Sequence, residues 1–241
     1  MLKIENAEVF GLEHAIRGMR NPMNSWKKSD SEFITEDGDH HDITGNSGPW
    51  YGEDGWNENL IGPKDRKLMV KLSRAGTDHR KFMRMITVYL DITAPLYWWK
   101  EFDTYKVGTV ANSCSTMHKI ADKEFTEEDF SFDHIIDEVT NSQCYTYRDT
   151  EWDAGDVTDL LIGILNHYRD LYLETKDKKY WWQMIQLLPS SYNQRRTIML
   201  NYEVLANIYK SRRNHKLDEW RTFCEWIEGL PMSEIITGEE K

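Results

Sequence analysis

The clearest pattern in the chain is an amphipathic stripe in its last third. Residues 156–175 (DVTDLLIGILNHYRDLYLET) carry apolar side chains at helical spacing, which predicts a helix with one buried face. The same reading predicts helices at residues 64–75, 192–210 and 217–227. The first of these is expected to end at Gly76, because glycine readily adopts the left-handed conformation that closes a helix.

Strands are predicted where apolar and polar residues alternate. Residues 3–10 alternate weakly, and residues 82–93 (FMRMITVYLDIT) alternate and are rich in β-branched side chains. A short helix is expected at residues 12–19. After the second strand, Pro95 suits the first turn of a helix, where the N–H that proline lacks would have no partner. We therefore predict a helix over residues 95–106.

That helix opens on Tyr97, Trp98 and Trp99 and then becomes polar. Aromatic residues at helical spacing usually belong to a core or an interface, so we expect the tryptophan pair to pack there rather than to stack on a ligand. Residues 21–63 have no sustained period and read as a long ordered loop or insertion. With no repeat and no linker, the chain is predicted to be a single α+β domain over residues 1–241, with a small antiparallel sheet and several long helices.

Composition narrows the functional classes. The 241 residues carry a formal net charge of −11, which disfavours binding to nucleic acid or to an anionic membrane. A small anionic ligand stays possible, because a local basic pocket can override the global sign. Three widely spaced cysteines, no signal-peptide core and no run of about 18 apolar residues indicate a soluble, cytoplasmic protein.

Two local patterns offer chemistry of their own. Cys114 is a candidate nucleophile if His118 or Lys119 lowers its pKa, whereas a buried and inert thiol is the simpler expectation. Residues 39–42 (DHHD) contain metal-ligand types without the helical spacing of strong metal motifs, so we expect no metal site.

The spacing of two proline-containing dipeptides and of several polar residues indicates a family. Ala94–Pro95 follows the second strand and Leu188–Pro189 precedes the penultimate helix. Five further residues lie at matching distances from these prolines: His79, Asn201, Leu205, Asn207 and Arg212. The segment Asp218–Trp220 is a looser match, displaced by one residue. In this order of elements the chain resembles the flavin-dependent thymidylate synthases, the ThyX family.

The resemblance implies reductive methylation of dUMP, with FAD as cofactor and NADPH and methylenetetrahydrofolate as cosubstrates, in a homotetramer that binds a pyrimidine nucleotide. It implies cofactor contacts by His79, Thr104, Tyr105, Lys106, Asn201 and Asn207. It implies substrate contacts by Ser113, Ser115, Arg195, Arg196 and Arg212, and catalytic roles for Arg212 and Cys114. A solvated helix face is the alternative interpretation of the arginines.

The sequence departs from the family pattern at its cations. The Arg-His-Arg motif reads Thr104, Tyr105 and Lys106, and the motif serine falls at Cys114. Three further family arginines are replaced by Thr116, Ile185 and Glu203. Two alternatives therefore stand beside the enzyme: a catalytically altered or inactive ThyX-derived nucleotide-binding protein, and a related pyrimidine one-carbon transferase.

Overall fold

The computed structural model describes residues 1–34, 39–45, 60–136 and 144–238. Two compact units emerge from it. Unit 1 comprises Met1–Ile4, Ile92–Thr104 and Asn112–Arg196, and unit 2 comprises Glu5–Asp91, Tyr105–Ala111 and Thr197–Lys241. Each unit is described by itself below. The expectation of one domain over residues 1–241 stays a prediction.

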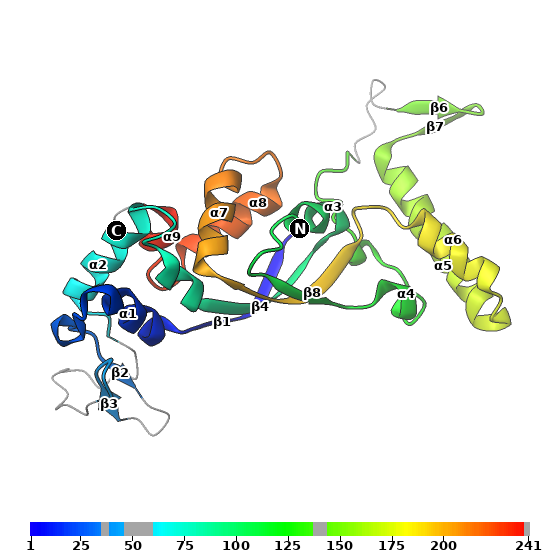
Figure 1. The fold of residues 1–241 in the computed structure, drawn as a ribbon. Coiled ribbons are helices and arrows are strands. Elements are labelled where there is room, and N and C mark those ends of the chain that lie inside the picture. The colour runs from blue at the N-terminus through cyan, green and yellow to red at the C-terminus, as the bar shows by residue number, and fades with distance from the viewer. Residues whose placement is uncertain (35–38, 46–59, 137–143, 239–241) are drawn as a thin grey trace. The chain divides into compact units, whose positions relative to one another are not determined.

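A four-stranded sheet has the strand order β1-β4-β8-β5 (Figure 1). Its strands are β1 (Lys3–Phe10), β4 (Thr87–Pro95), β8 (Asn193–Asn201) and β5 (Val110–Ser113), each with residues in both units. The small antiparallel sheet among several helices confirms the predicted α+β, ThyX-like architecture. Strand β1 has the predicted bounds.

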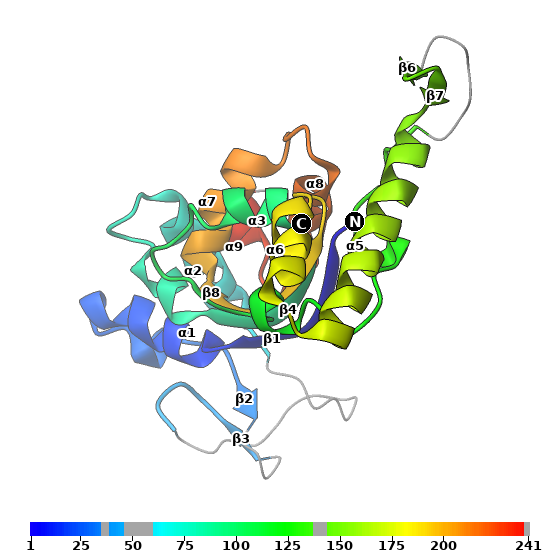
Figure 2. The same cartoon turned by 90° about the vertical axis from the view of Figure 1, so that its right-hand side faces the viewer.

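Unit 1 is mostly helical. It contains α3 (Leu96–Phe102), α4 (Thr116–Lys119), a 3₁₀ turn η4 (Glu127–Asp129), the hairpin β6 (Tyr145–Tyr147) and β7 (Thr150–Trp152), α5 (Ala154–Thr175) and α6 (Lys178–Leu187). Helix α5 confirms the strongest sequence pattern and begins with a capping box, in which Asp153 and Asp156 each accept from the other's backbone N–H. Figure 2 shows α5 and α6 side by side.

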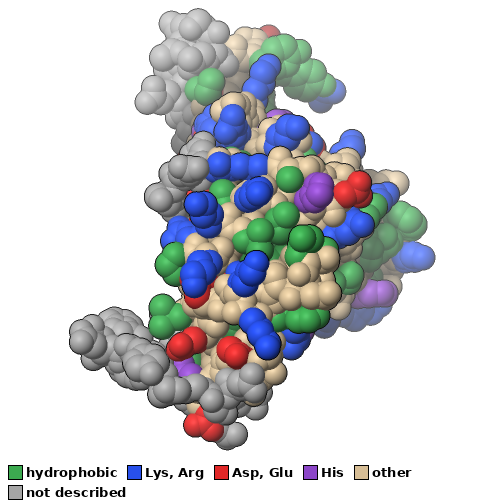
Figure 3. Space-filling view, turned by 60° about the vertical axis from the view of Figure 1, so that its left-hand side comes forward, with side chains coloured by type: hydrophobic (Ala, Val, Ile, Leu, Met, Phe, Trp, Pro, Cys, Tyr) green, Lys and Arg blue, Asp and Glu red, His purple; other side chains and the backbone are tan. Residues whose placement is uncertain are grey.

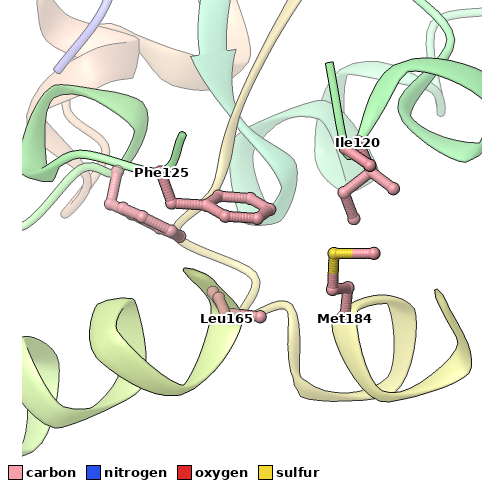
Figure 4. Packing of buried hydrophobic residues seen from close by; sticks show 6 residues of the cluster. Ile120, Phe125, Leu165 and Met184 are labelled. Carbon is pink, nitrogen blue, oxygen red and sulfur yellow. The ribbon is translucent and has the colours of Figure 1, made fainter. Parts of the chain in front are cut away.

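An apolar cluster holds α5 and α6 against the rest of unit 1. Leu165 of α5 and Met184 of α6 are fully buried, and they point toward Phe125 and Ile120 in Figure 4. Asn166 supports this packing, because its amide accepts from the N–H of Phe125 (2.8 Å) and donates to the carbonyl of the same residue (2.9 Å).

Unit 2 contains the remaining elements. They are α1 (Leu12–Arg20), η1 (Asn21–Met23), η2 (Trp26–Lys28), β2 (Phe33–Ile34), β3 (His40–His41), α2 (Pro63–Arg74), η3 (Lys81–Met85), α7 (Tyr202–Arg212), α8 (Asp218–Glu228) and α9 (Glu234–Thr237). Helices α1, α2 and α8 confirm predicted helices, and Gly76 has the expected positive φ of 98° just after α2. Parts of the predicted 21–63 loop, residues 35–38 and 46–59, lie outside the described residues.

Three predicted elements were wrong in part. The second strand begins at Thr87, because the adjacent residues Phe82 and Met83 lie in the 3₁₀ turn η3, which buries both of their side chains. The predicted helix over 95–106 is α3, which stops at Phe102. The carbonyl of Glu101 in its last turn accepts from the N–H (3.1 Å) and the hydroxyl (2.7 Å) of Thr104, which ends the helix.

The predicted helix over 192–210 is a strand followed by a helix. Strand β8 runs to Asn201, and its buried side chains alternate, with Ile198 and Leu200 inside. Helix α7 starts at Tyr202, where the side chain of Asn201 caps it by accepting from the N–H of Val204 (3.1 Å). Helix α6 was not predicted, although Asp177 marks its start as a cap.

Trp98 and Trp99 are fully buried, as expected for a packing role. They meet edge to face at 4.9 Å between ring centroids, and Phe102 stacks on Trp98 at 5.1 Å. Within the described residues, no helix is both long enough and apolar enough to cross a membrane.

A buried ion pair ties α1 to the start of α2 in unit 2. Arg20 is 4% exposed and Asp65 is 0% exposed, and the Nε of Arg20 donates to Oδ1 of Asp65 at 2.6 Å. The other carboxylate oxygen accepts from the hydroxyls of Ser29 (2.6 Å) and Ser31 (2.7 Å). Burial alone would raise the pKa of Asp65, but the hydrogen bonds from Ser29, Ser31, Arg20 and the N–H of Asp30 outweigh it and lower that pKa.

We expect Asp65→Asn to lower the free energy of unfolding by about 3–5 kcal/mol, because it leaves the Arg20 charge buried without a carboxylate. Asp78→Asn, at an exposed carboxylate of the same unit, should change it by less than about 0.5 kcal/mol. Because the folded pKa is lowered, the stabilisation from Asp65 is complete above the unfolded pKa of about 3.9 and is lost as pH falls through the folded value. Urea unfolding at pH 7 and pH 3 measures both effects, and equal stability of the two variants would contradict the assignment.

Candidate functional site

In unit 1 a groove runs along α3. It has a volume of about 690 Å³ and is lined by Leu96, Tyr97, Lys100, Glu101, Thr104, Leu188 and Ser190. Its size is that of a small-molecule site. The first turn of α3 is fixed beside it, because Leu96 donates its N–H to the carbonyl of Tyr192 (3.0 Å) and Tyr97 donates to Ser190 (2.9 Å). Of the predicted site residues, Thr104 lines this groove.

The predicted substrate-binding segment of unit 1, residues 113–115, lies at the end of strand β5 and directly after it. All four residues of β5 are exposed, including Ser113, and the following Cys114 is exposed as well. The expectation of a buried thiol was therefore wrong, because β5 lies at the end of the strand order and its last residues do not face a core. Ser115 caps α4 by accepting from the N–H of His118 (3.3 Å).

The two predicted arginines of β8 differ in their surroundings. Arg195 is exposed, and its carbonyl accepts from the N–H of Cys114 (2.9 Å). The side chain of Arg196 is 15% exposed and donates to Oδ1 of Asp103 at 2.7 Å. Its guanidinium lies over the ring of Trp99, 4.3 Å from the centroid. The structure thus brings Arg195 to Cys114, and Arg196 to the end of α3.

In unit 2, Arg212 at the end of α7 meets two aromatic side chains. Its Nε donates to the hydroxyl of Tyr105 at 3.0 Å. Its guanidinium carbon lies 4.8 Å from the ring centroid of Trp220 on α8. Trp220 is fully buried, so it offers a fixed surface. The sequence indicated Trp220 only as part of the loosely matched segment Asp218–Trp220. The signal that could have identified it is an aromatic residue that follows Arg212 closely in the chain.

Asn201 and Asn207 have separate places on α7. Asn201 is the N-cap, and its amide nitrogen approaches Gly108, where an added Cβ would come within 2.8 Å of it. Gly108 also has a positive φ of 82°, a backbone conformation that favours glycine. Asn207 is exposed on a helix whose other faces are largely buried. Lys106, close to Gly108 in the chain, is exposed.

His79 is exposed in the turn before η3, and its neighbour Arg80 carries the stronger interaction. Arg80 donates from Nε (3.1 Å) and Nη2 (3.0 Å) to Oε1 of Glu203 on α7. Glu203 is 8% exposed, so its charge needs such a partner. Sequence reasoning recorded Glu203 as a lost arginine. It missed Arg80, which places a guanidinium beside that position from another element.

Cations gather on one face of unit 2, as Figure 3 shows in blue. Helix α2 carries exposed Lys64, Lys67, Lys71 and Arg74 at a spacing that puts them on one stripe. The 3₁₀ turn η3 carries two further exposed cations, Lys81 and Arg84. In a chain with a net charge of −11, this stripe is a local reversal of sign that attracts anions. Among the described residues, no group of three or more His, Cys, Asp or Glu side chains could hold a metal ion.

Comparison of the sequence with protein-family profiles gives no match, and no characterised protein matches it. The fold does have solved counterparts. The flavin-dependent thymidylate synthase ThyX from Helicobacter pylori, complexed with FAD and dUMP, superposes with a TM-score of 0.61 at 15% identity, covering 98% of both chains.

This chain has the ThyX fold. The UMP/dUMP methylase PolB from Streptomyces cacaoi, bound with 5-Br dUMP, shares it with a TM-score of 0.56 at 15% identity, covering 99% of this chain and 95% of that one. Its complex with 5-Br UMP gives a TM-score of 0.58 at 13% identity, covering 99% and 94%.

The predicted site residues are divided between the two units. Unit 1 holds Thr104, Ser113, Cys114, Ser115, Arg195 and Arg196, and unit 2 holds His79, Tyr105, Lys106, Asn201, Asn207 and Arg212. The structure joins Tyr105 to Arg212 directly. Tyr105 thus gives the Nε of Arg212 a hydroxyl acceptor.

Tyr105→Phe tests that contact. The change removes the acceptor of Arg212 Nε and keeps the ring, so we expect a loss of about 1 kcal/mol in the free energy of unfolding, measured with urea. Tyr89→Phe, on an exposed tyrosine of the same unit, is the matched control and should leave stability unchanged. A Tyr105→Phe variant as stable as that control would show that the hydrogen bond contributes nothing.

Proposed function

We propose that the chain is a flavin-dependent enzyme that methylates dUMP reductively, with FAD as cofactor and with NADPH and methylenetetrahydrofolate as cosubstrates. The observation that carries this proposal is the place of Arg212. Sequence spacing matches it to an arginine of the ThyX family, and in the structure it contacts Tyr105 and Trp220. The described counterpart of that fold was solved with FAD and dUMP.

Arg212 suits the phosphate of a nucleotide. A guanidinium is planar and can donate two parallel hydrogen bonds to an oxyanion, and a buried aromatic surface limits its conformations before a ligand arrives. In this proposal Arg212 is the nucleotide contact of unit 2. Arg195 and the exposed segment Ser113–Ser115 are the nucleotide contacts proposed for unit 1. Cys114 then supplies a thiol where the family has a serine.

The residues of unit 2 also fit a dinucleotide cofactor. FAD carries a diphosphate, and the cations of α2 and η3 provide the matching local charge. Arg80 is oriented by Glu203, so a cation remains beside the position where the family has an arginine on α7. With His79, Tyr105, Lys106, Asn201 and Asn207 of the same unit, it would hold FAD, which supplies hydride transfer when bound. The homotetramer belongs to the same proposal.

A second candidate is a related pyrimidine one-carbon transferase. The specific observation in its favour is the likeness to PolB, a UMP/dUMP methylase, with TM-scores of 0.56 and 0.58 that approach that of ThyX. Three positions depart from the family pattern: Thr104, Tyr105 and Glu203. These departures are as consistent with a different substrate as with a loss of catalysis. Because PolB is named for both UMP and dUMP, methylation of UMP is the activity that distinguishes the second candidate from the first.

The visible spectrum of the purified protein is the first test. We expect a yellow protein, or one that binds added FAD tightly, whose flavin spectrum shifts when dUMP is added. Product analysis with NADPH and methylenetetrahydrofolate should then show dTMP. Methylated UMP instead would support the second candidate, and flavin binding without product would indicate the catalytically altered form. A colourless protein that ignores FAD and dUMP at high micromolar concentration would refute all three.

Arg212→Lys tests the proposed phosphate contact. Lysine keeps the charge but loses the planar fork and the contact with Trp220, so the Kd for dUMP should rise at least about tenfold, which is about 1.4 kcal/mol. The neighbouring exposed Arg213→Lys is the matched control and should bind dUMP like the unmodified protein. Equal losses in both variants would point to general electrostatics rather than to a contact made by Arg212.

A further inference from the structure

One amide in unit 1 contacts the predicted substrate-binding segment. Gln194 of β8 donates from Nε2 to the carbonyl of Cys114 (3.1 Å) and to the hydroxyl of Thr116 (3.2 Å). Its Oε1 accepts from Nε of Arg196 at 2.9 Å. Both ends of the amide are therefore used, one by the segment after β5 and the other by a cation of its own strand.

Arg196 decides which way this amide points. A guanidinium can only donate, so the oxygen of Gln194 must face Arg196 and the nitrogen must face the segment at Cys114. Arg196 is itself fixed by Asp103 and by the ring of Trp99. The orientation of the amide is thus set by groups that are fixed independently of the segment.

The main chain of Gln194 is held by the same tryptophan. Trp99 is fully buried and donates from Nε1 to the carbonyl of Gln194 at 2.8 Å. Because α3 packs through Trp99 and its neighbours Trp98 and Phe102, Gln194 rests on the rigid part of unit 1. The contacts run from the core, through Gln194, to an exposed segment.

The segment gains a defined backbone from these contacts. The N–H of Cys114 donates to the carbonyl of Arg195 (2.9 Å), and the carbonyl of Cys114 accepts from Nε2 of Gln194. Both backbone groups of Cys114 are therefore bound to β8. The side chains of Ser113, Cys114 and Ser115 are left exposed. A backbone fixed at Cys114, with exposed polar side chains on each side of it, is the arrangement of a pre-organised binding loop.

We propose that Gln194 and Arg196 are positioning residues that hold residues 113–116 in the conformation that binds the nucleotide. The inference rests on the proposed function and deepens it. It gives Arg196 a role other than the substrate contact expected from sequence, because its guanidinium orients Gln194 and pairs with Asp103. Gln194 acts through the backbone of Cys114 and does not touch the nucleotide.

Gln194→Glu is the sharpest test. A glutamate has the same size and still accepts from Arg196, but its carboxylate cannot donate to the carbonyl of Cys114 and repels it. Gln186→Glu is the matched control, since it makes the same change at an exposed position of α6 in the same unit. Asp103→Asn is a second variant that loosens Arg196 while leaving Gln194 in place.

Two measurements separate positioning from general damage. The first is the KM for dUMP and the kcat, expected to show KM about tenfold higher with kcat changed less than about twofold, because the loop and not the chemistry is disturbed. The second is the alkylation rate of Cys114 by iodoacetamide in the protein without nucleotide, followed by peptide mapping. It should rise several-fold in Gln194→Glu, and less in Asp103→Asn, with Cys144 as an internal reference thiol.

The outcomes divide clearly. If Gln194→Glu matches Gln186→Glu in both measurements, the inference is overturned. Faster alkylation of Cys114 with an unchanged KM would overturn the functional half, since the loop would then be loosened without effect on the nucleotide. If the unmodified protein binds no dUMP, the proposed function fails, while the alkylation rate still decides whether Gln194 holds the segment. If Gln194→Glu does not fold, Asp103→Asn decides both measurements by the same criteria.

Discussion

A charged side chain that leaves water needs a partner at a fixed distance, and this constraint organises both units. Asp65 is fully buried and is held by Arg20, which joins α1 to α2. Glu203 on α7 is held by Arg80. Arg196 on β8 is held by Asp103. Each pair links elements that are far apart in sequence, so the charges help to specify which elements meet.

The same constraint decides what the arginines can do. Arg196 looks like a candidate phosphate ligand when its sequence position is taken alone. In the structure it faces a carboxylate, an indole ring and an amide, and its effect is to orient Gln194. Arg212 is held instead by the hydroxyl of Tyr105 and the ring of Trp220. A guanidinium restrained by aromatic groups loses little conformational freedom when an oxyanion binds, which is why this arginine is the stronger candidate for ligand contact.

The three residues that the sequence matched to an Arg-His-Arg motif differ in their contacts. Thr104 seals the end of α3, and Tyr105 accepts from Arg212, while Lys106 is exposed. The three residues therefore have separate surroundings. A motif read as degenerate from sequence contains one residue that ends a helix and another that orients an arginine, and the adjacent Asp103 pairs with Arg196.

Local periodicity determined α1, α2, α5 and α8, because a face turned toward the interior repeats along each of them. The weak alternation of residues 3–10 also matched the bounds of β1, although no side chain of that strand is buried. The α+β class and the resemblance to ThyX followed from the same order of elements. The boundary at Asn201 depended on tertiary structure, since the residues before it pair with other strands and those after it form α7, which Asn201 caps. The exposure of Cys114 and the partners of Arg196 and Glu203 were likewise beyond sequence reasoning. They depend on which distant groups come within hydrogen-bonding distance, and no repeat along the chain encodes that distance.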